Sequence, residues 1–152
     1  MIGLDFLIPN QWGNFLSKIL DGVSIQNGIW KLAEEEILIK EGNYLFDKTI
    51  YNDEEFKQLI NSNEYYIIFS NIQLYSEHED EVIRNYTDYK KSKCTLILSV
   101  IDNIYVQVYS KDLTMLNQIN KNLIDNDFQN VRVITEDNEL KNLFPNYNDI
   151  NM

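Results

Sequence analysis

The stretch from residue 95 to residue 135 constrains the fold more than any other part of the chain. Two strand-like runs flank Asp102-Asn103, and two residues of this kind between such runs predict a hairpin. Apolar and polar side chains alternate along the second run, at 104–109, so one face of that strand should lie in the core. A helix capped by Ser110 and a final strand follow. A hairpin, a helix and a returning strand together predict an α+β arrangement.

The N-terminal part predicts a strand, a turn and a helix. Residues 2–8 are apolar and short, and Pro9-Asn10 ends the strand, with Asn10 as the N-cap of the helix. Apolar residues then recur with helical spacing and form one face. These residues are Trp12, Phe15, Leu16, Ile19 and Leu20. Gly22 lies where a helix C-cap is expected.

The middle of the chain alternates between strand-like and helical patterns. Residues 29–32 and 36–39 flank Ala33-Glu34-Glu35, which predicts a hairpin with the glutamates at or near its tip. A helix through the same residues is the alternative, because glutamate, leucine and alanine favour helices. Asn52 is expected to cap a helix whose first turn is acidic. An apolar strand follows at Tyr65–Phe69, with Ile72 to Leu74 as a further extension.

The remaining segments are shorter. We expect a polar loop at 76–86, a short helix capped by Thr87, a further helix at 138–143 and a loose polar tail at 146–152. The chain shows no internal repeat and no linker. We therefore expect a single globular domain over residues 1–152, of the α+β class. Its helices should pack on one face of a mixed, mostly antiparallel sheet.

The chain is strongly acidic, with 24 acidic and 13 basic residues and a formal net charge of −11. Nucleic acids and anionic lipids select basic surfaces, so this charge argues against a direct nucleic-acid partner and against a membrane role. No apolar run reaches the roughly 18 residues of a membrane-spanning helix. One cysteine leaves no partner for an intramolecular disulfide, as in reducing compartments. We expect a cytoplasmic protein without a signal peptide.

The charge is unevenly distributed along the chain. Residues 34–81 hold 13 acidic residues and three lysines, a net charge of −10, whereas residues 82–111 carry a net charge of +3. A surface polarised in this way steers and orients a charged partner. The acidic excess therefore favours a protein partner with a basic surface.

Residue types that carry chemistry at neutral pH are scarce. The one histidine, His78, lies between two glutamates in the polar loop, and such consecutive residues rarely converge on one metal ion. The one cysteine, Cys94, begins an apolar strand and fits a core position. Carboxylates are abundant, but no spacing singles out a pair for acid–base catalysis. The sequence therefore predicts no catalytic residue, no cofactor-binding residue and no metal site.

Partner binding is the role for which the sequence offers candidates. Tyrosine is enriched at interaction surfaces, although on alternating strand positions it is also an ordinary sheet residue. Tyr105 and Tyr109 lie on the same face of their strand. The candidate partner-binding residues are Glu34, Glu35, Glu36, Glu77, Glu79, Asp80, Glu81, Tyr105 and Tyr109.

Several segments carry a resemblance to a known family. They are Ile8-Pro9-Asn10 with Gly13-Asn14-Phe15-Leu16, the run Tyr65-Tyr66-Ile67-Ile68-Phe69-Ser70-Asn71, and the stretch from Cys94 to Asp112. Over nearly the whole chain the sequence resembles an uncharacterised family of Gram-positive bacteria, domain of unknown function 2691. The resemblance implies a small soluble bacterial protein and transfers no functional residue.

Three functions stay open at this point. The first is a non-enzymatic acidic protein that binds another macromolecule, for example an immunity-type inhibitor of a basic toxin or nuclease. The second is a small hydrolase that acts through carboxylates and a divalent cation. The third is a homo-oligomeric structural protein. The net charge of −10 over residues 34–81 and the tyrosine count favour the first.

Overall fold

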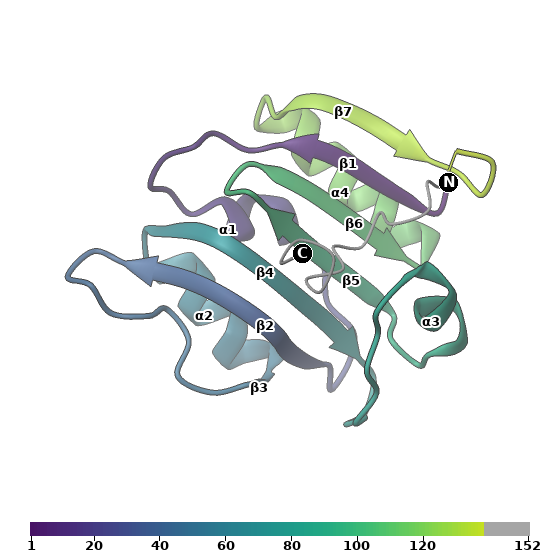
Figure 1. The fold of residues 1–152 in the computed structure, drawn as a ribbon, viewed down its shortest axis with the longest axis horizontal. Coiled ribbons are helices and arrows are strands. Elements are labelled where there is room, and N and C mark those ends of the chain that lie inside the picture. The colour runs from purple at the N-terminus through teal and green to yellow at the C-terminus, as the bar shows by residue number, and fades with distance from the viewer. Residues whose placement is uncertain (139–152) are drawn as a thin grey trace, which may run out of the picture.

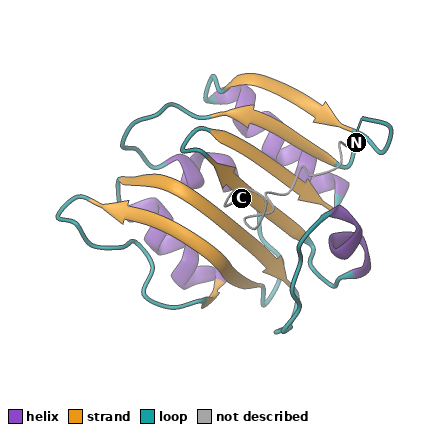
Figure 2. Ribbon diagram, viewed as in Figure 1, coloured by secondary structure: helices purple, strands orange, loops and turns teal. Residues whose placement is uncertain are grey.

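The computed structural model describes residues 1–138, which form one seven-stranded sheet and four helices (Figures 1 and 2). The strands are β1 (Gly3–Leu7), β2 (Ile29–Ile39), β3 (Ile50–Asn52), β4 (Tyr65–Tyr75), β5 (Leu96–Ile101), β6 (Tyr105–Ser110) and β7 (Gln129–Ile134). The helices are α1 (Phe15–Leu20), α2 (Asp53–Ser62), α3 (Tyr86–Lys91) and α4 (Leu113–Asp125). The strand order is β3-β2-β4-β5-β6-β1-β7, and all of these pairings are antiparallel. The expected α+β class is confirmed.

Helices α1, α2 and α4 cover one face of the sheet and lie behind it in Figure 1. Their apolar side chains meet alternate strand residues in the main core. Trp30 of β2 stacks on Phe56 of α2 with 4.3 Å between the ring centroids. The Tyr65 hydroxyl of β4 donates to the Ile60 carbonyl at 3.0 Å and accepts the Ser17 N–H at 3.2 Å. This tyrosine therefore ties two helices to the sheet.

Helix α3 is the exception to the expected one-sided packing. It packs against the opposite face of the sheet, which is turned toward the viewer in Figure 1 and is called the front face below. A second, smaller apolar cluster forms there around α3, and its buried members include Tyr75, Tyr89, Cys94, Ile97 and Tyr109. The front face is thus covered by α3 at one end, next to the C-terminal end of β4.

Local side-chain chemistry explains the elements that the sequence predicted correctly. Asn52 caps α2, and its Oδ1 accepts the N–H of Glu55 at 2.8 Å. Asp102 and Asn103 form the tight turn between β5 and β6, with φ angles of 52° and 71°. Because Ile101 pairs with Tyr105, the connecting loop has three residues, one more than predicted, and asparagine and aspartate tolerate its positive φ angles better than most residues.

The hairpin predicted within residues 29–39 is wrong, because β2 is one continuous strand. It pairs with β4 from Ile29–Tyr75 to Ile39–Tyr65. The pairing of this long strand with β4 shifts its register twice, once after Leu32 and once before Ile37. Positions 33–35 hold no glycine, proline or asparagine, so no residue there favours a tight turn. The glutamates therefore lie in mid-strand.

The first helix begins at Phe15 instead of following an Asn10 cap. Gly13 and Tyr65 exchange backbone hydrogen bonds of 3.0 and 3.1 Å. This bridge holds the loop that precedes the helix against β4, so the helix begins only after it. Trp12, which the helical spacing assigned to the core, is 40% exposed.

Two other helices are capped two residues away from the predicted position. Asp112, two residues beyond Ser110, caps α4 and accepts the N–H of Thr114 at 2.9 Å. Asn85, rather than Thr87, caps α3. Except for Asn138, the helix expected at 138–143 lies outside the described residues, as does the tail at 146–152. None of the helices within residues 1–138 has the length and apolarity that a membrane crossing requires.

Candidate partner-binding surface

A row of polar side chains crosses the front face from strand to strand. Cross-strand pairing aligns one residue from each of six strands: Glu34 (β2), Asn71 (β4), Ser99 (β5), Gln107 (β6), Asp5 (β1) and Arg132 (β7). Directly paired residues share a face of the sheet. An antiparallel sheet with helices on one face ordinarily carries polar residues on the other. The polar row therefore marks the front face as the side away from the main core.

A charge pair closes the β1–β7 end of this row. The Asp5 carboxylate is 5% exposed and accepts two bonds from the Arg132 guanidinium, at 2.8 and 3.1 Å. The Tyr105 hydroxyl donates to the same carboxylate at 3.1 Å. A buried carboxylate needs such bonds to offset its desolvation. The pair is thus a structural clamp that holds the edge strand β7 against β1.

Two polar atoms in the middle of the row make no hydrogen bond to any described residue. They are Ser99 Oγ and Gln107 Oε1, and their residues are 1% and 3% exposed. A buried polar atom without a partner lowers stability by about 1–3 kcal/mol. Burial also denies both side chains to a partner protein, so the centre of the row is not the candidate surface.

A cluster of aromatic side chains lies at the end of the front face away from α3. Tyr44 and Tyr66 flank Leu38 in one cross-strand row, and the Trp12 ring lies 5.8 Å from the Tyr66 ring, tilted by 48°. Trp12 and Tyr44 are 40% and 60% exposed. We call Trp12, Leu38, Tyr44 and Tyr66 the aromatic corner. Exposed, clustered tryptophan and tyrosine side chains are typical of protein interfaces.

Two of the three predicted β2 glutamates lie on the same face of the sheet as the aromatic corner. Glu34 and Glu36 pair with β4 residues on the front face. Glu35 pairs with Ser70 instead and accepts the Ile37 N–H at 3.1 Å. Desolvation by burial raises the pKa of the Glu35 carboxyl above 4.5, its ordinary value. Strand alternation therefore divides the triplet, and only two of its carboxylates are placed to meet a partner on the front face.

The predicted acidic loop lies at the other end of β4. It holds Glu77, Glu79, Asp80 and Glu81. An 11-residue strand separates this loop from the aromatic corner, a length of about 30 Å. The Lys93 ammonium lies 3.2 Å from Glu79 and 4.0 Å from Glu77, and the Lys93 N–H donates to Glu81 at 2.8 Å. The two predicted acidic groups are therefore not brought together, and a lysine partly neutralises the loop.

The two predicted tyrosines share the front face but differ in environment. Tyr105 is half-buried and belongs to the clamp around Asp5. Tyr109 is fully buried, and its ring packs 5.4 Å from Tyr86 and 6.1 Å from Tyr89. Tyr109 is thus a core residue beneath α3, and its predicted contact with a partner has no exposed surface to support it.

Sequence reasoning missed the aromatic corner as a unit. The helical spacing assigned Trp12 to a core face, and Tyr44 and Tyr66 belong to segments that are far apart in the chain. The pairing of β2 with β4 and the two isolated bridges, Leu38 with Tyr44 and Gly13 with Tyr65, bring these side chains together. The high tyrosine content was the one signal that pointed to such a surface.

The two residues with intrinsic reactivity do not form a catalytic site. The Cys94 thiol is buried and donates to the Leu96 carbonyl at 3.0 Å, and burial raises the pKa of this thiol to about 12. A thiol that stays protonated at neutral pH is a poor nucleophile. His78 is exposed and lies 3.5 Å from Asp80. Within residues 1–138, no group of three or more His, Cys, Asp or Glu side chains could hold a metal ion.

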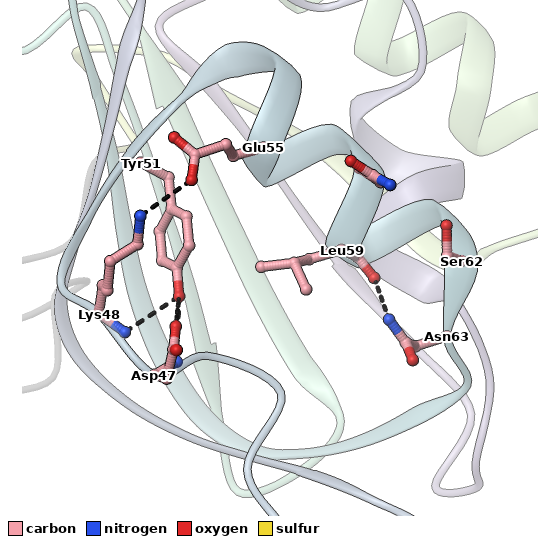
Figure 3. A pocket seen from close by; sticks show the side chains of 8 residues that line it. Asp47, Lys48, Tyr51, Glu55, Leu59, Ser62 and Asn63 are labelled. Atoms are coloured by element: carbon pink, nitrogen blue, oxygen red, sulfur yellow. Dashed lines mark hydrogen bonds and ion pairs between the residues drawn. The ribbon is translucent and has the colours of Figure 1, made fainter.

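A concave site of about 450 Å³ lies between α2 and the loop before β3 (Figure 3). Its two carboxylates, Asp47 and Glu55, are both engaged. The Tyr51 hydroxyl donates to Asp47 at 2.8 Å, and the Lys48 ammonium lies 2.9 Å from Glu55. Burial raises the pKa of Tyr51, so its hydroxyl stays a donor. Both carboxylates of this pocket are bound by its own side chains, so the pocket offers no carboxylate pair poised for hydrolysis.

Comparison with known proteins identifies the family to which the chain belongs. No solved structure matches the chain. The "Uncharacterized protein YncE" of Bacillus subtilis (strain 168) is 33% identical over 147 residues, which are 91% of this chain and 95% of that protein. The family model described as "Protein of unknown function (DUF2691)" matches residues 1–144. With a match over nearly its whole length, the chain belongs to the DUF2691 family, as its sequence motifs suggested.

Proposed function

We propose that this protein is a non-enzymatic binding protein that receives a basic partner protein at the aromatic corner. The observation that carries the proposal is the joint placement, on the front face, of exposed rings at one end and of two carboxylates, Glu34 and Glu36, further along β2. Rigid aromatic side chains supply contact area, and carboxylates select a cationic partner and speed its approach. An immunity-type inhibitor of a basic toxin or nuclease is the concrete form that we favour.

The local charge supports a basic partner. Residues 34–64 hold nine acidic residues and three lysines, a net charge of −6. Each lysine already has a carboxylate neighbour: Lys40 with Glu64, Lys48 with Glu55 and Lys57 with Asp53. Glu34 and Glu36 make no ion pair with any described residue. Their charges therefore remain available to a partner. The single, buried cysteine supports action in the cytoplasm.

The test is site-specific photocrosslinking in cells, with a benzoylphenylalanine in place of Tyr44. The matched control places the same group at Ile124 of α4, which is 65% exposed and lies on the helix side. We expect a protein of high isoelectric point to be captured at position 44 and not at position 124. Equal capture at both positions would contradict the proposal. Capture of a second copy of this chain at position 44 would support the homo-oligomer instead.

Charge reversal then tests the captured protein in purified form. We expect the double variant Glu34→Lys/Glu36→Lys to weaken its affinity about tenfold or more. The control Glu77→Lys/Asp80→Lys makes the same change in net charge on the distant loop and should alter affinity less than about twofold. The aromatic corner is not the binding surface if the two variants weaken affinity equally.

A further inference from the structure

A second, independent site lies at the rim of the helix layer, between two loops. The β1–α1 loop and the α4–β7 turn enclose a cleft of about 420 Å³, which we call the aromatic cleft. Its lining residues are Leu7, Ile8, Pro9, Gln11, Phe15, Lys18, Asn126, Asp127, Phe128 and Gln129. Small-molecule sites are commonly clefts of about 300–1,000 Å³, mostly apolar, with a few polar groups. The size and lining of the aromatic cleft fit that description.

Backbone hydrogen bonds fix both rims of the cleft. On one rim the Ile8 N–H donates to Ile104 at 2.8 Å, and the Gln11 N–H donates to Pro9 at 2.9 Å. On the other rim the Phe128 N–H donates to Leu123 at 3.0 Å. Loops held in this way need little ordering when a ligand binds, which preserves affinity. The cleft is thus preformed.

Two rings form its apolar wall. Phe15 is buried to 5% exposure, Phe128 is half-buried, and their centroids lie 6.4 Å apart with an edge-on angle of 66°. Phe6 supports Phe128 from the core at 5.6 Å. A wall of two edge-on rings suits a flat or branched apolar group, which can pack against ring faces and edges.

One cation at the cleft has no counterion within residues 1–138. The Lys18 ammonium lies 5.5 Å from the Phe15 ring centroid and makes no ion pair with any described residue. Asp127 lines the same cleft, yet it does not pair with Lys18. In a chain with 24 acidic residues, most lysines find a carboxylate. An unpaired ammonium over an aromatic wall leaves room for an anionic group of a ligand.

We propose that the aromatic cleft binds a small carboxylate with an aromatic or branched apolar body. The carboxylate pairs with Lys18, and the apolar body packs against the wall that Phe15 and Phe128 form. The Gln11 amide at the rim supplies a further donor, whereas the Gln129 amide donates to the Asp127 carbonyl at 2.9 Å. This site does not depend on the proposed binding of a protein at the aromatic corner.

The test is a titration of the full chain, followed by amide NMR shifts, with phenylacetate as the probe. Neutral phenylacetamide and cationic phenethylamine serve as matched ligands. We expect phenylacetate to shift the amides of residues 8–11 and 126–129 and to bind at least about tenfold more tightly than the other two. Saturable binding of all three with equal affinity would overturn carboxylate recognition. The absence of shifts at these amides up to tens of millimolar would overturn the site.

Variants separate the role of the charge from folding. Lys18→Met removes an exposed ammonium and should leave the fold intact. We expect it to weaken phenylacetate binding about tenfold while it leaves phenylacetamide within about twofold. The control Lys91→Met removes an exposed lysine from α3, on the opposite face, and should change neither affinity. An equal effect of both variants on phenylacetate would show that net charge, not the cleft, governs binding.

Discussion

Ser70 of β4 offers a direct test of the reasoning about unpaired polar atoms. Its side chain is fully buried, and its Oγ makes no hydrogen bond to any described residue. Its neighbours across the sheet are Val100 and Glu35. The hydroxyl therefore lost its bonds to water on folding and gained no replacement from residues 1–138.

Replacing Ser70 with alanine removes that atom and should stabilise the protein. A buried polar group without a bond costs about 1–3 kcal/mol. Removing the oxygen atom also leaves a small space, and the dispersion contacts that surrounding atoms lose there offset part of this stabilisation. We expect a net increase of about 1 kcal/mol in the free energy of unfolding. For a chain of this length that corresponds to a rise of about 2–4 °C in Tm.

Urea denaturation followed by circular dichroism measures this change, with Ser92→Ala as the matched control. The Ser92 hydroxyl donates to the Tyr89 carbonyl at 2.7 Å and accepts the Cys94 N–H at 3.1 Å, so its loss should destabilise by about 1 kcal/mol. The two serine variants should thus move the denaturation midpoint in opposite directions. A lower midpoint for Ser70→Ala would refute the argument that its hydroxyl is unsatisfied.

Three further predictions concern binding, pH and thiol reactivity. Tyr44→Ala should weaken partner affinity about tenfold or more, whereas Ile124→Ala should leave it unchanged, as measured by calorimetry with the captured protein. Glu35→Gln should be more stable than the wild type at pH 7. Burial raises the folded-state pKa of Glu35 above 4.5, so wild-type stability increases as pH falls through that folded pKa. The difference in stability between the variant and the wild type should therefore close near pH 4.5. A stability difference that does not depend on pH in urea titrations would contradict this. The Cys94 thiol, with a pKa of about 12, should react with a disulfide reagent at pH 8 far more slowly in the folded protein than in concentrated guanidinium chloride, and equal rates would show that it is accessible.

Part of the structure followed from signals that lie within a few residues of one another. Asn52 placed the start of α2, and Asp102-Asn103 placed the β5–β6 turn, since capping and turn formation depend on local hydrogen bonds and backbone angles. The same reasoning was wrong at residues 29–39. A run of glutamates suggested a turn there, but the long pairing with β4 extends the chain, because tertiary context overrides local preference.

The candidate surface shows more clearly which features a sequence alone does not determine. Composition alone established an acidic chain with many tyrosines and few reactive side chains, and these properties depend on no contact. Pairing between distant strands decided the rest. It assembled the aromatic corner, buried Tyr109 beneath α3 and turned Glu35 away from Glu34 and Glu36. The physical reason is that a strand's residue pattern fixes which side chains alternate, whereas its neighbours and register fix which of them meet.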